Sequence, residues 1–470
     1  MQRRPTCSIL ASAIVLTLAA APAFAATTEL PRTVRPNHYD VTITPHAQAL
    51  DFDGRVEIAI EVLEATDRIT LNARDLVFSK VVLEGEDGDD VSARPKITLD
   101  DKTQTATFTF PATIAPGKYR LALDYTGRIA TQPAGLFAMD YDTKAGKRRA
   151  LFTQFEAPDA RAMVPSWDEP AYKATFALTA VVPADQMAVS NMPVAARTEL
   201  PGNLASVRFA PTPKMSTYLL FLAAGDFDRA SAQVDGTDLG VITQKGLAGQ
   251  AAFALESSKD VLREYNDYFG TPYPLPKLDN VASPGSSQWF SAMENWGAIF
   301  SFERSLLLDP TISTQSDKQR VFGTAAHEIA HQWFGNLVTM GWWDDLWLNE
   351  GFATWMAGRT TQKLHPEWNT AMGTVASRDR AMGRDAVAST HPVVMPVATV
   401  AEATQNFDAI TYSKGSAIIR MLEGYVGADN WRAGVRNYMK KHAYGNTRSV
   451  DLWTAIQDAS GMPITALPFW

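Results

Sequence analysis

The stretch Thr324-Ala-Ala-His-Glu-Ile-Ala-His-Gln-Trp-Phe-Gly335 constrains this chain more than any other. His327 and His331 stand four residues apart, so both imidazoles project from one face of an α-helix. That spacing suits two ligands of one zinc ion. Glu328 stands beside them and is a candidate for handling a proton, because its own direction on the helix prevents it from sharing the ion.

The flanking residues predict that this stretch lies in a buried helix over about 317–337. Ser316-Asp-Lys-Gln319 has the form of a capping box that would begin the helix. Apolar residues recur at helical spacing around the two histidines. An amphipathic helix with two ordinary histidines is the alternative. Buried imidazoles without partners are costly, however, and metal binding would satisfy them.

Glu350 is the candidate for a third metal ligand. A metzincin would place a glycine three residues and a histidine six residues beyond His331, where this chain has Phe334 and Leu337, and that class is excluded. Glu350 follows far enough along the chain to lie on a second helix, predicted at about 345–362. Two histidines and one glutamate leave a fourth position open for water, as in catalytic zinc sites.

The first 25 residues have the pattern of a secretory signal peptide. Arg3 and Arg4 are followed by an apolar stretch over 8–21 and by the small-x-small site Ala23-Phe-Ala25. An uncleaved anchor is the alternative. We expect an exported protein, periplasmic or extracellular.

Removal of this segment changes the composition of the 470-residue chain in two ways. The only cysteine, Cys7, is lost, which suits an oxidising compartment. The net charge moves from −8 to −10 as Arg3 and Arg4 leave, and an acidic protein has no general electrostatic reason to bind nucleic acid. No later stretch has the apolar length of a membrane span. The sequence makes no prediction about the oligomeric state.

Hydrophobic periodicity divides the rest of the chain in two. From Leu30 to about Ala230 the period is two, which predicts an antiparallel β domain over 26–235. Within it, the continuous apolar run Thr217–Ala224 is typical of a buried strand. Helical spacing predominates afterwards, with helices expected at about 251–269, 412–426, 429–442 and 450–460. We therefore place a mainly helical domain with the metal motif over 236–470.

Two further residues are candidates on their own chemistry. Tyr412 has a phenol that can stabilise an oxyanion, although a tyrosine that begins an apolar helix is more often a core residue. Glu294 lies in Ser291-Ala-Met-Glu-Asn-Trp-Gly297, where it would bind a substrate cation near the metal or lie in a surface turn.

Four stretches together resemble the aminopeptidase N family of zinc aminopeptidases. They are Gln154-Phe-Glu156 with the following 160–170, then 291–297, then 327–350, and finally Tyr412 with Lys414-Gly415. Their order and spacing also match, so the resemblance covers nearly everything after the first 25 residues. It implies a multidomain β plus α/β architecture, with a saddle-like N-terminal β-sheet domain and a thermolysin-like, mainly helical catalytic domain.

The resemblance also implies the roles of individual residues. His327, His331 and Glu350 would bind one zinc ion. Glu328 would be the general base that activates water, and Tyr412 would stabilise the oxyanion. The substrate residues it implies are Glu294, Glu156 and Gln154 for the free α-amino group, with the backbone of Ala292 and Met293 for an extended peptide. The implied activity is removal of N-terminal residues from peptides that have a free N-terminus.

The chain departs from the family pattern at three places, one of which, Ser166 where many relatives have a cysteine, suits a thiol-free exported chain. Ser291 stands where the family has glycine, and serine would strain the loop if the backbone there needed a positive φ. The chain also ends near the end of the family's catalytic domain, so we expect the family's C-terminal helical domain to be absent and favour a fragment. A zinc endopeptidase and an inactive, truncated peptide-binding protein are the alternative functions.

Overall fold

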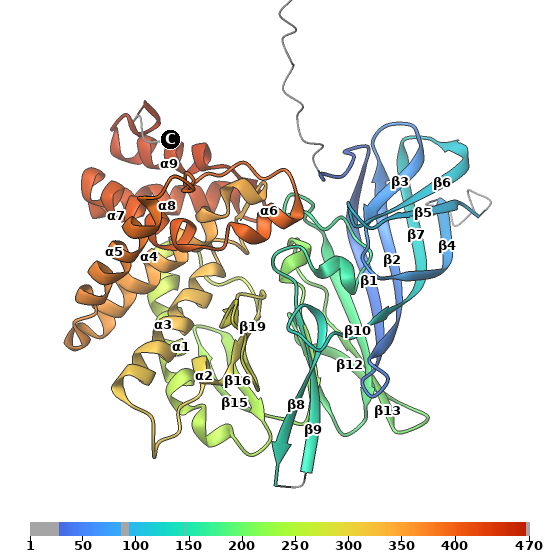
Figure 1. Ribbon diagram of the computed structural model, residues 1–470, viewed down its shortest axis with the longest axis horizontal. Helices are drawn as coiled ribbons and strands as arrows, with labels where there is room; N and C mark the ends of the chain where they lie inside the picture. Colours follow the sequence, from blue (N-terminus) through green and yellow to red (C-terminus); the bar gives the residue numbers. More distant parts are fainter. Residues whose placement is uncertain (1–27, 86–93, 145, 467–470) are drawn as a thin grey trace, which may run out of the picture.

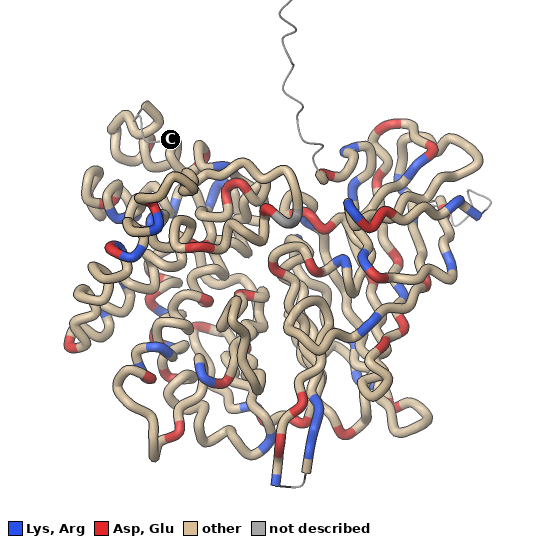
Figure 2. The backbone as a smooth tube through the Cα atoms, in the orientation of Figure 1, with Lys and Arg blue, Asp and Glu red and all other residues tan. Residues whose placement is uncertain are grey.

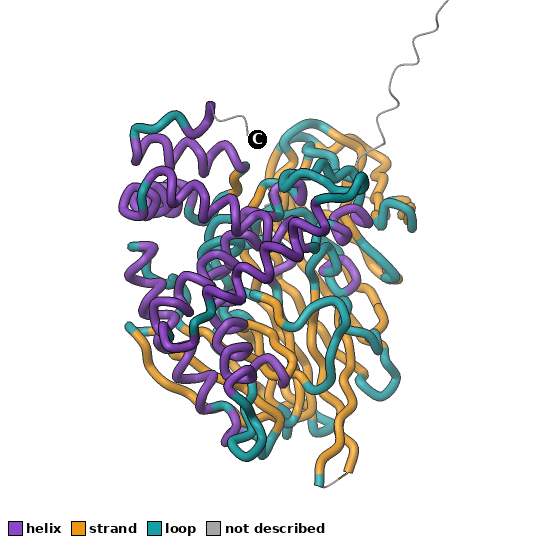
Figure 3. Tube along the Cα trace, turned by 60° about the vertical axis from the view of Figure 1, so that its left-hand side comes forward, coloured by secondary structure: helices purple, strands orange, loops and turns teal. Residues whose placement is uncertain are grey.

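The computed structural model describes residues 28–85, 94–144 and 146–466, and the predicted signal peptide at 1–25 lies outside them. Strands predominate in the first half of the chain and helices in the second (Figure 1). In Figure 3 the helices gather on one side and the strands on the other. The predicted fold class, a β domain followed by a mainly helical domain, is confirmed.

Three sheets form the N-terminal domain, and some of their strands, such as β2 (Asp51–Val62), show alternating burial. In β2, Val56, Ile58 and Ile60 are buried between more exposed residues. The seven-stranded sheet has the order β12 (Val194–Leu200), β13 (Leu204–Phe209), β10 (Thr175–Pro183), β1 (Val34–His46), β2 (Asp51–Val62), β7 (Gly117–Arg128) and β4 (Val77–Gly85). The others have the orders β3 (Thr66–Asn72), β6 (Thr105–Ile114), β5 (Lys96–Asp100), and β11 (Met187–Ser190), β14 (Leu222–Gly225), β9 (Gly146–Gln154), β8 (Gly135–Thr143).

Two details of this domain differ from the prediction. β1 runs parallel to β10, from His38 opposite Thr175 onward, because the long connection between them permits a crossover. The expected strand at Thr217–Ala224 is a 3₁₀ turn over Thr217–Leu219 followed by the short β14. The Thr217 hydroxyl donates to Asp168 Oδ1 at 2.5 Å.

A five-stranded sheet begins the second domain. Its order is β15 (Phe227–Val234), β16 (Thr237–Gln244), β17 (Lys277–Ser283), β19 (Ala298–Phe302) and β18 (Ala292–Met293). β16, β17 and β19 are parallel, whereas β18 is antiparallel to β19 and forms one edge. The predicted boundary at 235/236 falls in the turn between β15 and β16, which pair with each other.

The first helices of this domain pack beside the sheet, and the later ones pack mainly on other helices. The helices at or near the predicted places are α1 (Ala252–Phe269), α3 (Gln315–His331), α4 (Trp347–Leu364), α7 (Gly415–Val426), α8 (Ala428–His442) and α9 (Ser449–Ser460). The sequence did not indicate α2 (Glu303–Leu306), α5 (Ala371–Asp385) and α6 (Val400–Gln405). The short strands β20 (Thr339–Met340) and β21 (Asn446–Thr447) pair beyond α3.

The predicted start and end of the metal-motif helix need correction. Thr314 and Asp317 form its capping box, in place of Ser316 and Gln319, because the Thr314 side chain accepts from the Asp317 amide. α3 ends at His331, and a tight turn follows directly. The predicted end near 337 is therefore about six residues too late.

Aromatic packing joins the two domains. Phe300 of β19 lies 5.6 Å from Phe152 of β9 and 6.0 Å from Phe137 of β8, measured between ring centroids. These contacts hold β8 and the end of β9 against β19 of the five-stranded sheet.

Acidic and basic residues are interspersed along the coloured backbone of both domains (Figure 2). No helix within the described ranges combines the length and the apolar character that crossing a membrane requires.

Candidate metal centre

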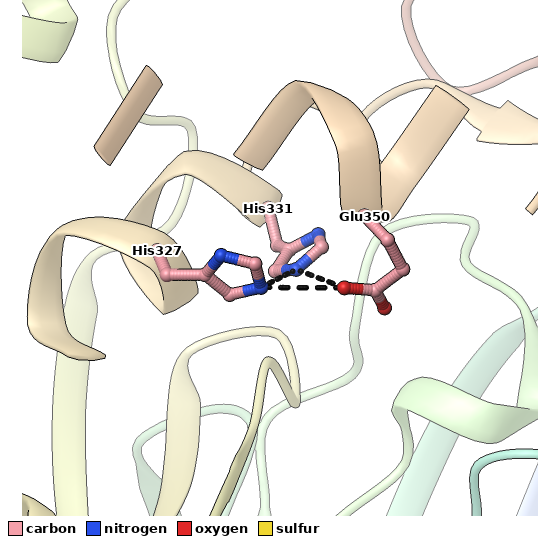
Figure 4. A group of neighbouring side chains, drawn as sticks. All are labelled: His327, His331 and Glu350. Atoms are coloured by element: carbon pink, nitrogen blue, oxygen red, sulfur yellow. Dashed lines mark hydrogen bonds and ion pairs between the residues drawn. The ribbon is translucent and has the colours of Figure 1, made fainter. Parts of the chain in front are cut away.

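Two consecutive long helices bring the three predicted metal ligands together. His327 and His331 lie on the last turns of α3, and Glu350 lies on the first turn of α4. His327 Nε2 is 3.0 Å from His331 Nε2 and 3.2 Å from Glu350 Oε2, and His331 Nε2 is 3.5 Å from the same oxygen. Figure 4 shows the three atoms converging on one point.

The donor atoms fit a zinc ion. Ligands about 2.0–2.1 Å from a tetrahedral zinc lie about 3.3 Å from one another, close to the three observed separations. His331 Nδ1 lies 3.0 Å from the carbonyl oxygen of Phe334, which can only accept. Nδ1 therefore carries the hydrogen, which leaves the Nε2 lone pair for a metal.

Glu328 points into the same site without joining the three ligands. A carboxylate oxygen of Glu328 lies within 4.8 Å of ligand atoms of Glu294 and His331. Burial raises the pKa of Glu328 well above its ordinary value; His331 opposes this effect, and the carboxylates of Glu294 and Glu350 add to it. A buried carboxylate of raised basicity is suited to accept a proton from water.

The segment 291–297 is tied to the end of α3 by two amides that sequence reasoning missed. Gln332 Nε2 and Asn336 Nδ2 donate to the Glu294 carbonyl oxygen at 3.1 and 2.8 Å. Both are fully buried. Their signal in the sequence is weak: two amides within an otherwise apolar stretch.

Gly297 closes this segment in a way that only glycine allows. Its φ is +79°, and a Cβ there would lie 2.3 Å from the Asn191 carbonyl oxygen. At the other end, Ser291 is not among the residues with positive φ, and its carbonyl oxygen accepts from the Phe302 amide at 3.0 Å. The strain considered for a serine at this position is therefore absent.

Three buried side-chain oxygens face the cluster from the other side. Gln154 ends β9, Glu156 follows it, and Glu294 follows β18. Within the described residues, one side-chain oxygen of each has no hydrogen-bond partner. Carboxylate oxygens of Glu156, Glu294 and Glu350 lie within 4.8 Å of one another. Unpaired buried acceptors of this kind favour a cationic donor.

Burial also shifts the pKa values of these acids. It raises the pKa of Glu294 to about 7, with His331 opposing the shift. It raises the pKa of Glu156 as well, and the neighbouring Glu294 adds to the shift. Gln154 is oriented by its Nε2, which donates to the Glu156 carbonyl oxygen at 3.3 Å, so its own oxygen is left as an acceptor.

Tyr412 lies on a π-helix over Ile410–Lys414 rather than on an ordinary helix start. Its ring is nearly parallel to that of His327, with centroids 6.1 Å apart and planes inclined by 18°. Burial, together with the charge of Glu350, raises the pKa of the Tyr412 phenol well above its ordinary value. The phenol therefore stays protonated and can donate.

One cavity of about 390 Å³ joins all these groups. Ala292 of β18 lines it, whereas the side chain of Met293 is buried. Its wall also contains residues that the sequence did not indicate: Trp289, Phe290, Thr404, Gln405 and Phe407. Trp289 is 92% exposed. Nothing in their spacing points to a common wall, since 289–290 and 404–407 are far apart in the chain.

The fold and the site together are those of a metallopeptidase. Residues 253–470 match the peptidase family M1 domain, and residues 35–219 match the peptidase M1 N-terminal domain. The chain belongs to peptidase family M1.

Named relatives agree with this assignment. Aminopeptidase N of Acetobacter pasteurianus is 45% identical over 70% of this chain and 91% of its own length. Aminopeptidase M1-C of Oryza sativa subsp. japonica is 39% identical over 93% of this chain and 49% of its own length. Puromycin-sensitive aminopeptidase of Caenorhabditis elegans is 37% identical over 93% and 46%. The chain thus spans about half the length of most of the curated relatives it matches.

Proposed function

We propose that this chain is a zinc-dependent aminopeptidase that removes N-terminal residues from peptides. The observation that carries the proposal is one cavity with two unlike sides. The histidine and glutamate cluster forms one side, and the unpaired acceptors of Gln154, Glu156 and Glu294 form the other. A site of this kind selects a free α-ammonium group next to the bond that is cut.

His327, His331 and Glu350 would hold the zinc ion, and their separations support this assignment. When bound, zinc acts as a Lewis acid towards a carbonyl oxygen and makes water a stronger acid. The rest of the chemistry falls to side chains of this chain.

Glu328 is the general base in this proposal. Its carboxylate takes a proton from the attacking water and passes it to the leaving amine nitrogen. The raised pKa of Glu328 makes its carboxylate a stronger base towards the attacking water.

Tyr412 donates a hydrogen bond to the oxyanion that develops on the scissile carbonyl. A neutral phenol does this without adding charge to a site that already holds four glutamates: Glu156, Glu294, Glu328 and Glu350.

The edge strand β18 supports binding of the peptide in extended form. β18 pairs with β19 on one side only, with Ala292 opposite Ser301 and Met293 opposite Phe300. An added peptide strand would use the backbone groups on its other side. The amine-binding acceptors then limit cleavage to the first residue.

We further propose that the protein acts in the periplasm or outside the cell. The basic start, the apolar stretch and the Ala23-Phe-Ala25 site support export, as does a chain whose only cysteine lies within this leader. Fractionation of expressing cells, with amino-terminal sequencing of the product, tests this. Export with a new terminus near Ala26 supports it, and an intact cytosolic product contradicts it.

The activity is tested by initial hydrolysis rates on leucine p-nitroanilide and its N-acetyl counterpart, with and without a zinc chelator. Chelator-sensitive cleavage of the free-amine substrate alone is expected. Cleavage of both substrates would favour an endopeptidase. Absence of cleavage by protein shown to contain one zinc per chain would contradict the proposed activity for this chain.

Metal identity is tested separately by elemental analysis of the purified protein. We expect one zinc per chain, and loss of zinc on substitution of His327 or Glu350 by alanine. Retention of full stoichiometry in both variants would contradict the assigned ligands.

A further inference from the structure

The π-helix that carries Tyr412 is an uncommon conformation that needs support from its surroundings. One side is pressed against α4, directly beside a metal ligand. A Cβ on Gly351 would lie 3.1 Å from the Gly415 backbone and 3.2 Å from the Thr411 carbonyl oxygen. The direction of Tyr412 therefore depends on how the first turn of the π-helix is held.

Asp408 holds that first turn. Its Oδ1 accepts from the amides of Ile410 and Thr411 at 2.9 and 3.2 Å. Its backbone carbonyl oxygen accepts from the Tyr412 amide at 3.1 Å. Three successive amides of the turn thus bond to one residue.

His391 holds Asp408 from a different segment, the connection between α5 and α6. His391 Nε2 lies 3.2 Å from Asp408 Oδ2, the oxygen that the amides do not use. His391 Nδ1 lies 2.7 Å from the carbonyl oxygen of Pro392. Both side chains are mostly buried, with exposed fractions of 19% and 23%. The Asp408 and Pro392 oxygens both only accept, so the ring holds the Asp408 carboxylate as an imidazolium, which has an N–H on each nitrogen.

A second attachment lies at the other end of the π-helix. Lys414 Nζ is 2.9 Å from Asp385 Oδ2, and Asp385 Oδ1 accepts from the Thr390 hydroxyl at 2.7 Å. This attachment does not involve the amides of 410–412. It ties the connection that carries His391 to the end of the π-helix.

We propose that Asp408, oriented by His391, is a positioning residue that aims the Tyr412 hydroxyl at the developing oxyanion. The inference rests on the proposed aminopeptidase activity and adds a part to it. Asp408 does not touch substrate: it acts through Tyr412 by holding the backbone from which the phenol projects.

Steady-state kinetics on leucine p-nitroanilide tests this proposal. Because the Tyr412 bond strengthens in the transition state, Asp408→Ala should lower kcat by about 10²-fold with KM within about twofold. Asp408→Asn keeps an oxygen that can accept from the two amides, so its kcat should fall less than that of Asp408→Ala. Asp309 accepts from the Thr311 amide at 2.8 Å in an exposed turn, so Asp309→Asn is a matched control that should keep the wild-type kcat.

A double-mutant cycle separates positioning from a general structural effect. If Asp408 acts through Tyr412, Asp408→Ala in a Tyr412→Phe background should change kcat less than twofold. Multiplicative losses in the double variant, or an unchanged kcat in folded Asp408→Ala, would overturn the proposal. If Asp408→Ala does not fold, the same cycle with Asp408→Asn decides. Inactive wild-type protein containing one zinc would instead contradict the underlying activity.

Discussion

The ring of Phe334 stacks on the ring of Phe352, with centroids 3.4 Å apart and planes inclined by 13°. Phe334 follows the proposed metal ligand His331 by three residues, and Phe352 follows the proposed ligand Glu350 by two. Both rings are buried. This contact joins the end of α3 to the start of α4 and so sets the separation of the ligands on the two helices.

Phe352→Ala should therefore weaken both the fold and the metal site. Truncation of a buried phenylalanine costs about 3–5 kcal/mol of the free energy of unfolding. Loss of support behind the ligands should lower zinc affinity by about 10- to 100-fold. Urea unfolding and competition with a chromogenic chelator measure the two effects. Phe352→Leu keeps more of the volume and should lie between the wild type and alanine; an alanine variant with wild-type affinity would contradict this role.

Glu328→Gln should keep the metal and lose the chemistry. Glutamine has nearly the same shape but cannot take a proton from water, so kcat should fall by at least about 10²-fold. Elemental analysis should still find one zinc per chain. Glu256→Gln changes an exposed glutamate on α1 and serves as the matched control. Substantial turnover by Glu328→Gln would remove Glu328 as the base.

Glu294→Ala should reduce discrimination between free and blocked amino termini. The carboxylate contributes a charge-assisted hydrogen bond to the ammonium group, worth about 1.5–3 kcal/mol, or about 10- to 100-fold in the ratio of kcat/KM values. The bonds from Gln332 and Asn336 go to the Glu294 backbone, so the loop should keep its place. The ratio is measured with leucine p-nitroanilide and its N-acetyl counterpart at high enzyme concentration. An unchanged ratio would exclude Glu294 from amine binding.

Glu169 should make stability depend on pH. Burial raises its pKa from 4.5 to about 7, although the Leu30 amide and Arg32 act in the opposite direction. Between these values the folded protein binds more protons than the unfolded chain, so the contribution of Glu169 is complete below about pH 4.5 and is lost as pH rises through about 7.

Glu169→Gln provides the comparison, because glutamine can still accept from the Leu30 amide. The free energy of urea unfolding, measured from pH 4.5 to 8, should fall with pH more steeply in the wild type than in the variant. Parallel curves would show that Glu169 titrates at the same pH in both states.

Local patterns predicted the two helices that carry the three candidate metal ligands. The expected helix at about 345–362 corresponds to α4, Trp347–Leu364, and Glu350 lies on its first turn. The end of α3 was missed because the chain leaves the helix at His331 so that the Phe334 carbonyl can face the imidazole. The turn places the Phe334 carbonyl oxygen beside His331 Nδ1. The periodicity of apolar residues gives no information about such a contact.

The surroundings of the site were less accessible to sequence reasoning. Phe290 and Phe407 form one cavity wall although more than a hundred residues separate them. In the sequence, Asp408 looks like any other residue that precedes a helix. The π-helix over Ile410–Lys414 has no clear sequence pattern either. The role of Gln332 and Asn336 can be recognised only from the structure, which shows that both side chains donate to the Glu294 carbonyl oxygen.

The sequence by itself indicated three candidate metal ligands and determined the relation of His327 to His331, because a spacing of four within one helix is local geometry. Only the tertiary structure decided that Gln154, Glu156, Glu294 and Tyr412 face the same cavity. These residues come from β9, the loop after β18 and a π-helix, and the packing of Phe152 on Phe300 brings the first two elements together. Such convergence depends on how sheets and helices bury their apolar faces, which no single stretch of the chain encodes.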